Sequence, residues 1–598
     1  MPQLTPSGKT LAVRDEALVL SSGGGLSLES GDVAKVVHFF GVPWRATTVT
    51  EFLGHTRLDC ESSAKSRALC SSDTFFELIR ELENNSEAIR PWRERVHSVF
   101  VYAGDVPAVL QKLLQRLTGD EGVVLSQMNR SGGDFVVSGQ LDGFCGVMAG
   151  VRVTESRANR DTDLVLNASK GNANSIISLG HGATFLRLEY NGVPVFLSTS
   201  REIIDIDAEL ASQNFNVREH FLSAVPLVLY VKWAFAETCW NAPETNACLV
   251  IDDPLLKRTH GFVDFQELSS LMQRHKFSTN VAFIPWNWRR SAPEVVRLFR
   301  ENPERYSLSV HGCDHTRAEF GSSSQQRLYW KAQQAIQRMD RHRSITGIHH
   351  DPVMVFPQGI FSEAAMSALK RTDLIAAVNN DIISADPYPR TITVSDVWDI
   401  AVMGYSTFPL FTRRYPWEGI ENFAFDALLG KPAIAVIHHD YCSDHCARLV
   451  NFIEQLNGLK IAPIWRSLGE VVRNSCRQKE VSPGNVEVEM YGTELWIENR
   501  SQERKHFLIR RRECEPSAIQ RISTDSQTIA WKPANGRIDF EIELNPGENQ
   551  VIKIRFHDLA ENGCNGDNLP YRLKAMLRRY LCEVRDNYVT PMRFRFAG

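Results

Sequence analysis

The stretch LVIDDPLL, residues 249–256, places two adjacent carboxylates at the end of an apolar run. Three apolar residues typical of a buried strand precede Asp252 and Asp253, and Pro254 follows them. Two carboxylates at the end of a buried strand repel each other and lose hydration, so a fold rarely places them there without a cation or a proton to share. We therefore expect another part of the chain to supply a partner for this pair.

Two histidines four residues apart follow a second apolar run, in SLSVHGCDHTRAEF. His311 and His315 can face one cation whether their segment is a helical turn or a tight loop. Carboxylate and imidazole groups are the donors that suit zinc or another borderline divalent metal. Together with Asp253 they would supply three ligands and leave one position open for water.

Two more apolar runs end in polar residues that complete this set. MVFPQGIFS, residues 354–362, carries Gln358 in a turn that can aim backbone N–H groups at an oxyanion. KPAIAVIHHDY, residues 431–441, ends in His438 and His439, at a position where a general acid is expected. Polar clusters at the carboxyl ends of strands in one α/β domain would lie on the same face of a barrel, where such folds place their sites.

The order of strand-like and helix-like segments predicts several domains. Alternation over residues 1–215 predicts a Rossmann-like or flavodoxin-like α/β domain, and 216–244 a connecting apolar helix. Alternation resumes over 245–475, which predicts a second α/β domain with a barrel. Strict apolar–polar alternation and an NPGEN turn predict an antiparallel β-sandwich over 483–557, and a helix and tail close the chain over 568–598.

Two local patterns predict more detailed structure. Asn191-Gly192 lies between two strand-like runs and predicts a β-hairpin. The last helix carries one apolar stripe, formed by Leu573, Leu577, Leu581 and Val584. We expect this helix to pack on the body of the protein, and contact of its basic face with a membrane is the alternative.

The composition limits the classes of partner. The 598 residues include 67 Lys plus Arg against 71 Asp plus Glu, a formal charge of −4, so overall charge indicates neither nucleic acid nor an anionic membrane as a partner. The apolar segment 221–237 contains Lys232 and is shorter than the roughly 20 residues that span a bilayer, so we expect a buried helix and no membrane span. The N-terminus lacks the apolar core of a signal peptide, and the twelve cysteines have no repeating spacing; both features favour a cytoplasmic location.

The four polar motifs resemble those of the polysaccharide deacetylase family, the carbohydrate esterases that share the chitooligosaccharide deacetylase homology domain. The Asp-Asp pair matches the end of the family's first motif, T-F-D-D-G, and the His-x-x-x-His pair matches the second, H-[ST]-x-x-H. Pro357-Gln358-Gly359 matches part of the third, R-x-P-x-G, and IAVIHH matches the last, an apolar strand that ends in His. Order and spacing agree over residues 245–445.

The resemblance implies a central (β/α) barrel of the polysaccharide deacetylase type and a metal-dependent hydrolase that removes an acetyl group from an N-acetylated sugar or glycan. Asp253, His311 and His315 would hold a divalent metal, Zn²⁺ by preference. Asp252 would take the proton of the attacking water, and the metal with the backbone N–H of Gln358 would stabilise the oxyanion. A histidine of the 438/439 pair would protonate the departing amine; strand phase favours His438, and the family's His-Asp order favours His439.

Three residues depart from the family pattern. Val355 stands where the family has the Arg that orients the base, Pro254 replaces the first-motif Gly, and Gly312 replaces the second-motif hydroxyl residue. Asp381 and Asp396 are candidates for the acid that would have partnered this Arg, with ordinary loop carboxylates as the alternative. A catalytically inactive glycan- or nucleotide-sugar-binding scaffold of the same fold is therefore the alternative function.

Two further features allow a functional and a structural interpretation. Cys442, His445 and Cys446 could belong to a structural zinc site, but no second Cys/His pair follows at zinc-finger spacing, so we expect incidental thiols. Aromatic residues in predicted loops could stack on sugar rings or cap the core; these are Trp286, Trp288, Tyr415 and Trp417.

Overall fold

The computed structural model describes residues 16–23, 28–58, 65–104, 106–127, 133–154, 164–167, 175–210, 212–559, 569–590 and 592. Contacts divide the chain into two compact units. The first takes in residues 1–206, 216–241 and 479–485, and the second takes in 207–215, 242–478 and 486–598. The apolar helix expected to connect two domains thus groups with the first unit, whereas the second α/β domain, the β-rich region and the C-terminal helix group together.

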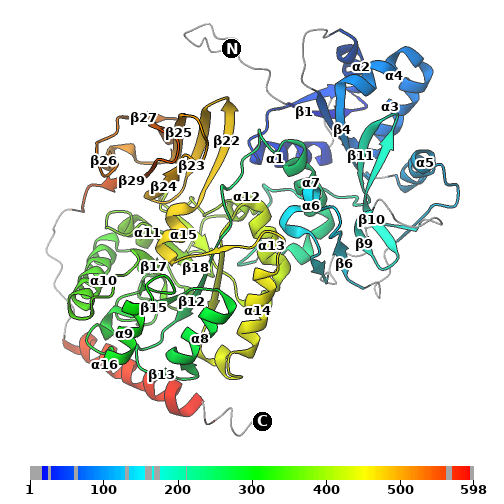
Figure 1. Cartoon of the computed structure of the whole chain (residues 1–598). Helices are drawn as coiled ribbons and strands as arrows, with labels where there is room; N and C mark the ends of the chain where they lie inside the picture. The colour runs from blue at the N-terminus through cyan, green and yellow to red at the C-terminus, as the bar shows by residue number, and fades with distance from the viewer. Residues whose placement is uncertain are drawn as a thin grey trace. The chain divides into compact units, whose positions relative to one another are not determined.

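The first unit is built on one sheet whose first five strands are parallel. Their order is β2-β1-β3-β4-β11, formed by β2 (Trp44–Thr48), β1 (Ala17–Ser21), β3 (Ser66–Ser71), β4 (Val96–Tyr102) and β11 (Val193–Ser198). The helices between them are α1 (Leu28–Phe39), α2 (Val49–Leu58), α3 (Ser72–Asn84), α4 (Ile89–Arg95) and α5 (Pro107–Thr118) (Figure 1). The strand–helix alternation predicted such a parallel sheet.

The same sheet continues with antiparallel strands. β10 (Gly182–Tyr190) pairs with β11 across Asn191-Gly192, whose φ angles of 46° and 80° confirm the predicted hairpin. The remaining elements are β9 (Ser175–Leu179), β6 (Phe135–Val137), β7 (Arg152–Val153), β5 (Val124–Gln127), β8 (Leu164–Asn167) and α6 (Asp142–Cys145). α7 (Phe221–Ala234) buries 11 of its 14 side chains, which confirms the predicted buried helix. Among the described residues, no helix is both long enough and apolar enough to span a membrane.

The second unit has a parallel sheet at its centre. The order β19-β18-β17-β16-β15-β12-β20 comprises β19 (Leu410–Thr412), β18 (Ala376–Asn379), β17 (Val353–Val355), β16 (Tyr306–His311), β15 (Thr279–Phe283), β12 (Asn246–Asp252) and β20 (Ala433–Ile437). The short β21 (Ile464–Trp465) pairs with β12. Arg414, two residues after β19, joins this edge of the sheet to β20. Its N–H donates to the carbonyl of Ile434 at 3.0 Å, and its carbonyl accepts from the N–H of Val436 at 2.9 Å. The two edge strands therefore meet at one bridge.

Helices surround this sheet (Figure 1). They are α8 (Phe265–His275), α9 (Pro293–Glu301), α10 (Gln325–Thr346), α11 (Glu363–Leu369), α12 (Val394–Trp398), α13 (Ile420–Leu429), α14 (Ala447–Asn457) and α15 (Leu468–Asn474). α10, the longest, begins after Ser324, whose side chain accepts from the N–H of Arg327, and ends at Gly347 with φ 73°. Because the strands are parallel and buried, their carboxyl ends bring polar residues to one face.

Antiparallel strands follow in two sheets that share one core. The sheet that contains β23 (Asn485–Met490), β25 (Lys505–Arg512), β28 (Arg537–Leu544) and β27 (Trp531–Ala534) has β22 (Cys476–Ser482) at its edge. The other consists of β24 (Glu494–Glu498), β29 (Asn549–Phe556) and β26 (Ile519–Ser523). Burial alternates along β28, where Ile538, Phe540, Ile542 and Leu544 enter the core.

The C-terminal helix, α16 (Leu569–Val584), packs on the second unit, but not through the apolar stripe of its sequence. Ala575 and Arg579 are its buried residues, and the leucines of the stripe are exposed. Glu583 accounts for this orientation, because its carboxylate binds Lys257 and Arg290 at 2.5 Å each. The helix therefore packs through its polar face.

A buried ionic cluster joins the β-rich region to the parallel-sheet domain. Glu513, which follows β25, binds Lys370 at the end of α11 and Arg511 of its own strand, the latter at 2.9 Å. The side chains of Glu513 and Arg511 are 0% exposed. One carboxylate thus balances two buried cations.

Replacing Glu513 by Ala is expected to lower the melting temperature of the second unit by roughly 5–15 °C, because two cations would stay buried without a carboxylate. Differential scanning calorimetry measures the change. Glu541→Ala, on the exposed face of β28, is the matched control and should shift it by about 1 °C or less. Equal shifts in the two variants would show that the cluster does not hold the two parts together.

Candidate metal centre

Asp252, the last residue of β12, is bound to a buried arginine. Arg413, just after β19, donates from both terminal nitrogens to both carboxylate oxygens, at 2.7 Å each. The side chain of Arg413 is 3% exposed and that of Asp252 is 5% exposed. Burial alone raises the pKa of Asp252, but the charges of Arg413 and His311 outweigh it and bring this pKa below its usual value. Asp252 is therefore held ionised and fixed in orientation.

Asp253 points instead toward the two histidines. Its Oδ1 lies 2.9 Å from Nε2 of His315 and 3.4 Å from Nε2 of His311. One donor atom from each of the three residues lies within 4.8 Å of the other two, which is the spacing of a metal-ligand set. Asp253 Oδ1 is buried without a well-formed hydrogen bond. A divalent cation bound by one carboxylate and two imidazoles would satisfy this atom.

The ring of His311 is oriented for ligation by its other nitrogen. Its Nδ1 lies 3.0 Å from the carbonyl oxygen of Val355, which can only accept. Nδ1 therefore carries the proton, and Nε2 offers its lone pair on the side of Asp253. Val355, which stands where the family has Arg, thus contributes its backbone to the site.

The loop that carries His315 is fixed by Glu319. The Glu319 carboxylate accepts the backbone N–H groups of Cys313, Asp314 and His315, at 2.9, 2.8 and 3.1 Å. Gly312 begins the loop with φ 61°, and a Cβ there would lie 2.3 Å from Cγ of Pro357. This close contact, together with the left-handed backbone, favours Gly at this position.

Three candidate site residues adopt left-handed backbone conformations that are uncommon outside glycine. Asp253, His315 and Gln358 have φ angles of 77°, 55° and 59°. Such conformations cost about 1–3 kcal/mol each and persist where the surrounding structure enforces them, often at functional sites. Their occurrence at these three positions indicates that the local backbone is shaped for this arrangement of side chains.

α16 reaches the candidate centre through Arg579. A terminal nitrogen of Arg579 lies 3.1 Å from Nδ1 of His315, and burial lowers the pKa of both side chains. Arg579 can only donate, so Nδ1 of His315 accepts and Nε2 carries the proton. A metal at Nε2 requires the opposite tautomer, so ligation by His315 would displace this contact. The donor set fits a divalent metal, with this one arginine competing.

A cavity of about 410 Å³ brings the other candidates together. Asp253 and His315 line it with Gln358 and His438, and α16 contributes Arg579 among its walls. The ring of His438 lies 6.3 Å from that of Tyr415. The structure thus places His438, and not His439, beside the three-residue group.

His439 is not among the described residues that line this cavity, and it makes a buried contact with the C-terminal segment. Its Nε2 is 3.6 Å from the carboxylate of Asp586, and its ring stacks on Phe262 at 6.1 Å. A Cβ on Gly261 would lie 2.3 Å from its Nδ1. These contacts give His439 a structural role in the loop.

Two other groups of potential metal ligands are less suited to a metal, because their members already bind other residues or lie apart. Cys313 and Glu319 approach Asp314, but Asp314 already binds Lys331 at 2.8 Å and Arg338 at 2.6 Å. Within the described ranges, Cys442, His445 and Cys446 form no group of three converging donors, and the His445 side chain is 94% exposed.

Arg413 and Arg579 are the site residues that the sequence reasoning missed. Arg413 follows the short apolar run FPLFT. Its position at the end of a strand-like run is the sequence feature that could have identified it as a site residue. Asp381, a candidate partner for the family's Arg, lies close enough for Arg413 to lower its pKa, although burial raises that pKa overall. Asp396 instead caps α12 by accepting from the N–H of Thr393. No local pattern marked Arg579.

The comparisons with known proteins show a distant structural likeness. A protein from Mycobacterium smegmatis assigned as a polysaccharide deacetylase matches with a TM-score of 0.26, covering 38% of this chain and 88% of its own. The Xyl-CE4 domain of a multidomain xylanase from the hindgut metagenome of Trinervitermes trinervoides gives 0.24 over 38 and 89%, and a family 4 carbohydrate esterase from Streptomyces lividans gives 0.23 over 36 and 90%. Each is 12% identical in sequence. No family model and no curated protein matches the chain.

Replacing Arg413 by Gln is expected to lower the free energy of unfolding of the second unit by about 3 kcal/mol, because Asp252 would stay buried without its cation. Urea titration measures it. Adding Asp252→Asn should restore most of the loss, since the neutral amide needs no counter-charge. A double variant as unstable as the sum of the single variants would show that the two side chains act independently.

Replacing Arg579 by Gln is expected to tighten the binding of a divalent metal by about 10–100-fold, because the Gln oxygen can accept from Nδ1–H of a ligating His315. Competition with a chromogenic zinc chelator measures the affinity. Arg572→Gln, on the exposed side of the same helix, should leave it unchanged. Equal or weaker binding by the Arg579 variant would contradict the competition inferred here.

Proposed function

We propose that this protein is a metal-dependent hydrolase that removes an acetyl group from an N-acetylated sugar or glycan. One observation carries the proposal: two adjacent carboxylates are separated, with Asp252 bound to Arg413 and Asp253 facing two imidazoles. Amide hydrolysis by an activated water needs an ionised base that is not itself a metal ligand, placed beside a metal-ligand set. This pair supplies both within one dipeptide.

The residues have separate roles in the proposed reaction. Asp253, His311 and His315 would hold the metal, which when bound acidifies water and polarises the acetyl carbonyl. Asp252 accepts the proton of the attacking water on a carboxylate that Arg413 keeps oriented. The lowered pKa of Asp252, in which the charge of Arg413 outweighs burial, keeps this base deprotonated near neutral pH.

Two more residues act on the substrate side. His438, in the same cavity, protonates the departing amine. The backbone N–H of Gln358 donates to the oxyanion that develops on the acetyl carbonyl oxygen.

An aromatic pair beside His438 supports a carbohydrate as the substrate. The rings of Tyr415 and Trp417 stack at 4.1 Å with an interplanar angle of 11°, and Trp417 is 60% exposed. Exposed aromatic faces bind the apolar faces of sugar rings. The ring of Trp288, in contrast, is covered by the guanidinium of Arg289, whose Cζ lies 4.1 Å from the ring centroid.

A catalytically inactive glycan-binding protein of the same fold is the second candidate. The contact between Arg579 and His315 favours it, because this contact opposes metal ligation. The ordered Asp252–Arg413 pair favours the hydrolase, since a binding scaffold has no need of an oriented base.

Asp252→Asn is expected to retain the metal and to lower the rate of acetate release from N-acetylated oligosaccharides by at least about 100-fold, because general-base catalysis contributes 10²–10⁴. Asp253→Ala should lose both metal and activity. Elemental analysis and an acetate assay measure the two quantities, with exposed His445→Ala as the control. Metal in the wild type with no acetate release from any substrate would favour the binding protein, and full activity in Asp252→Asn would exclude the mechanism.

A further inference from the structure

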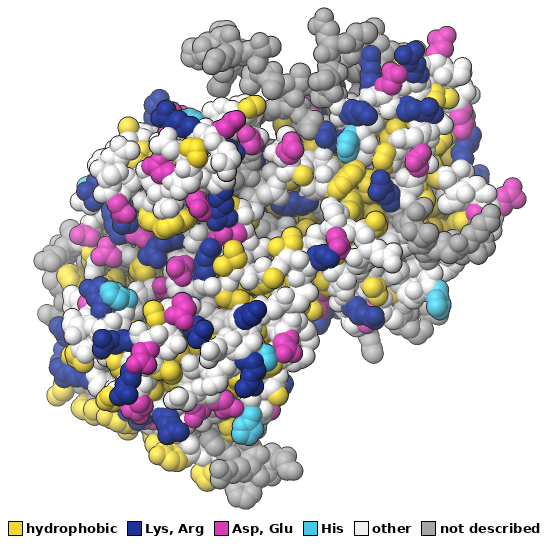
Figure 2. Space-filling model, viewed as in Figure 1, with side chains coloured by type: hydrophobic (Ala, Val, Ile, Leu, Met, Phe, Trp, Pro, Cys, Tyr) yellow, Lys and Arg dark blue, Asp and Glu magenta, His cyan; other side chains and the backbone are white. Residues whose placement is uncertain are grey.

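α16 exposes a continuous apolar surface on the second unit. Its four-residue stripe is between 49 and 61% exposed: Leu573, Leu577, Leu581 and Val584. Leu569, Met576, Tyr580 and Tyr588 extend the same surface. Figure 2 shows hydrophobic side chains gathered along the edge of the molecule where Figure 1 places α16. Exposed apolar surface of this extent on one helix indicates a site of interaction.

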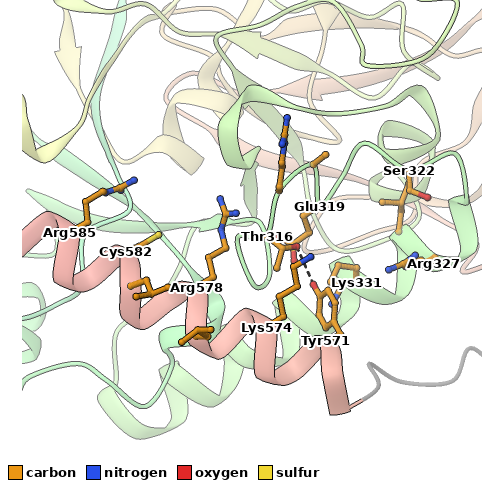
Figure 3. A pocket seen from close by; sticks show the side chains of 15 residues that line it. Thr316, Glu319, Ser322, Arg327, Lys331, Tyr571, Lys574, Arg578, Cys582 and Arg585 are labelled. Atoms are coloured by element: carbon orange, nitrogen blue, oxygen red, sulfur yellow. Dashed lines mark hydrogen bonds between the residues drawn. The ribbon is translucent and has the colours of Figure 1, made fainter.

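A cationic cavity adjoins this stripe. It has a volume of about 760 Å³ and lies between α16 and the segment 316–331. Leu577 and Leu581 line it, so the stripe and the cavity share one wall. Figure 3 shows Lys574 and Arg578 extending from α16 toward the loop of Thr316 and Glu319. Six basic residues line the space. Lys331 and Arg585 are paired with Asp314 and Asp586, which leaves four: Arg317, Arg327, Lys574 and Arg578.

Among the described residues, these four cations have no acidic partner. In the part of the chain that the structure describes, none of them forms an ion pair, and Nε of Arg578 is buried without a hydrogen-bond partner. The cavity's acid, Glu319, is occupied by three backbone N–H groups. The cavity therefore has a net positive charge, although the whole chain has a formal charge of −4.

We propose that α16 and this cavity dock the protein on an anionic lipid bilayer. The leucine stripe enters the boundary between headgroups and acyl chains, and the cavity binds lipid phosphates. An amphipathic helix with basic residues beside its apolar face binds interfaces in this way, and each basic residue near an anionic surface adds about fivefold in affinity.

Charge favours a bilayer over a second copy of the chain. In a two-fold dimer through α16, the stripe of one copy would meet the stripe of the other, and the Lys574 and Arg578 side chains of both copies would be brought to one interface. Such like charges repel, whereas lipid phosphates complement them.

Docking would also place the candidate metal centre near the membrane. The cationic cavity shares Arg578, Cys582 and Arg585 with the cavity that contains Asp253 and His315. The two cavities therefore share part of the wall that α16 forms. This proposal holds whether or not the centre is catalytic.

Vesicle co-sedimentation with the full chain tests the proposal. The wild type is expected to bind vesicles of equal parts phosphatidylglycerol and phosphatidylcholine, to bind pure phosphatidylcholine weakly, and to dissociate as salt is raised. Lys574→Glu/Arg578→Glu should reduce the partition coefficient by at least about 25-fold, from about fivefold per basic residue. Leu577→Glu/Leu581→Glu should abolish binding, and since both leucines are exposed, the fold should be kept.

Two matched controls keep the test specific. Arg521→Glu/Lys532→Glu makes the same change in charge on exposed strands of the β-rich region, and Ile345→Glu/Ile461→Glu makes the same apolar-to-acid change elsewhere on the second unit. Both controls should bind like the wild type. No binding of the wild type to anionic vesicles at low salt, or equal losses in control and α16 variants, would overturn the proposal. A wild-type dimer in light scattering that Leu577→Glu/Leu581→Glu dissociates would overturn it in favour of a second copy.

Discussion

The buried pair of Arg413 and Asp252 is the interaction on which the candidate site depends. Two adjacent carboxylates at the end of a buried strand cannot both remain ionised without compensation. Arg413 compensates the first from across the sheet, 161 residues away in sequence. The second, Asp253, turns through a left-handed backbone toward His311 and His315. One dipeptide thus presents one carboxylate to a guanidinium and the other to two imidazoles.

The sequence predicted those parts of the site that short patterns define. Asp253, His311 and His315 follow long apolar strands, and the structure brings them together. Arg413 could not be found in the same way, because it follows a strand of three residues and its partner is set by the closure of the sheet at Arg414. The family pattern directed attention to Val355, which contributes only its carbonyl. Long-range pairing of this kind leaves no periodic signal.

α16 shows the same limit for packing. The leucine stripe predicted an amphipathic helix, but the period of a stripe does not say which face meets the protein. Glu583, with Lys257 and Arg290, turns the polar face inward and leaves the leucines exposed. As a result, the helix contacts the candidate metal centre through Arg579, which lies beside His315, and exposes its apolar stripe to the outside. The formal charge of the whole chain, −4, did not predict the cationic cavity beside α16.

The central claim is that Asp253 and the two histidines hold a metal while Asp252 stays with Arg413. Anomalous diffraction from crystals grown with zinc tests it most directly. We expect one strong peak at about 2.0–2.2 Å from a carboxylate oxygen of Asp253 and the Nε2 atoms of both histidines, with Asp252 still bound to Arg413. A peak ligated by Asp252, or one located only at Cys313 and Glu319, would contradict this division of roles between the two carboxylates.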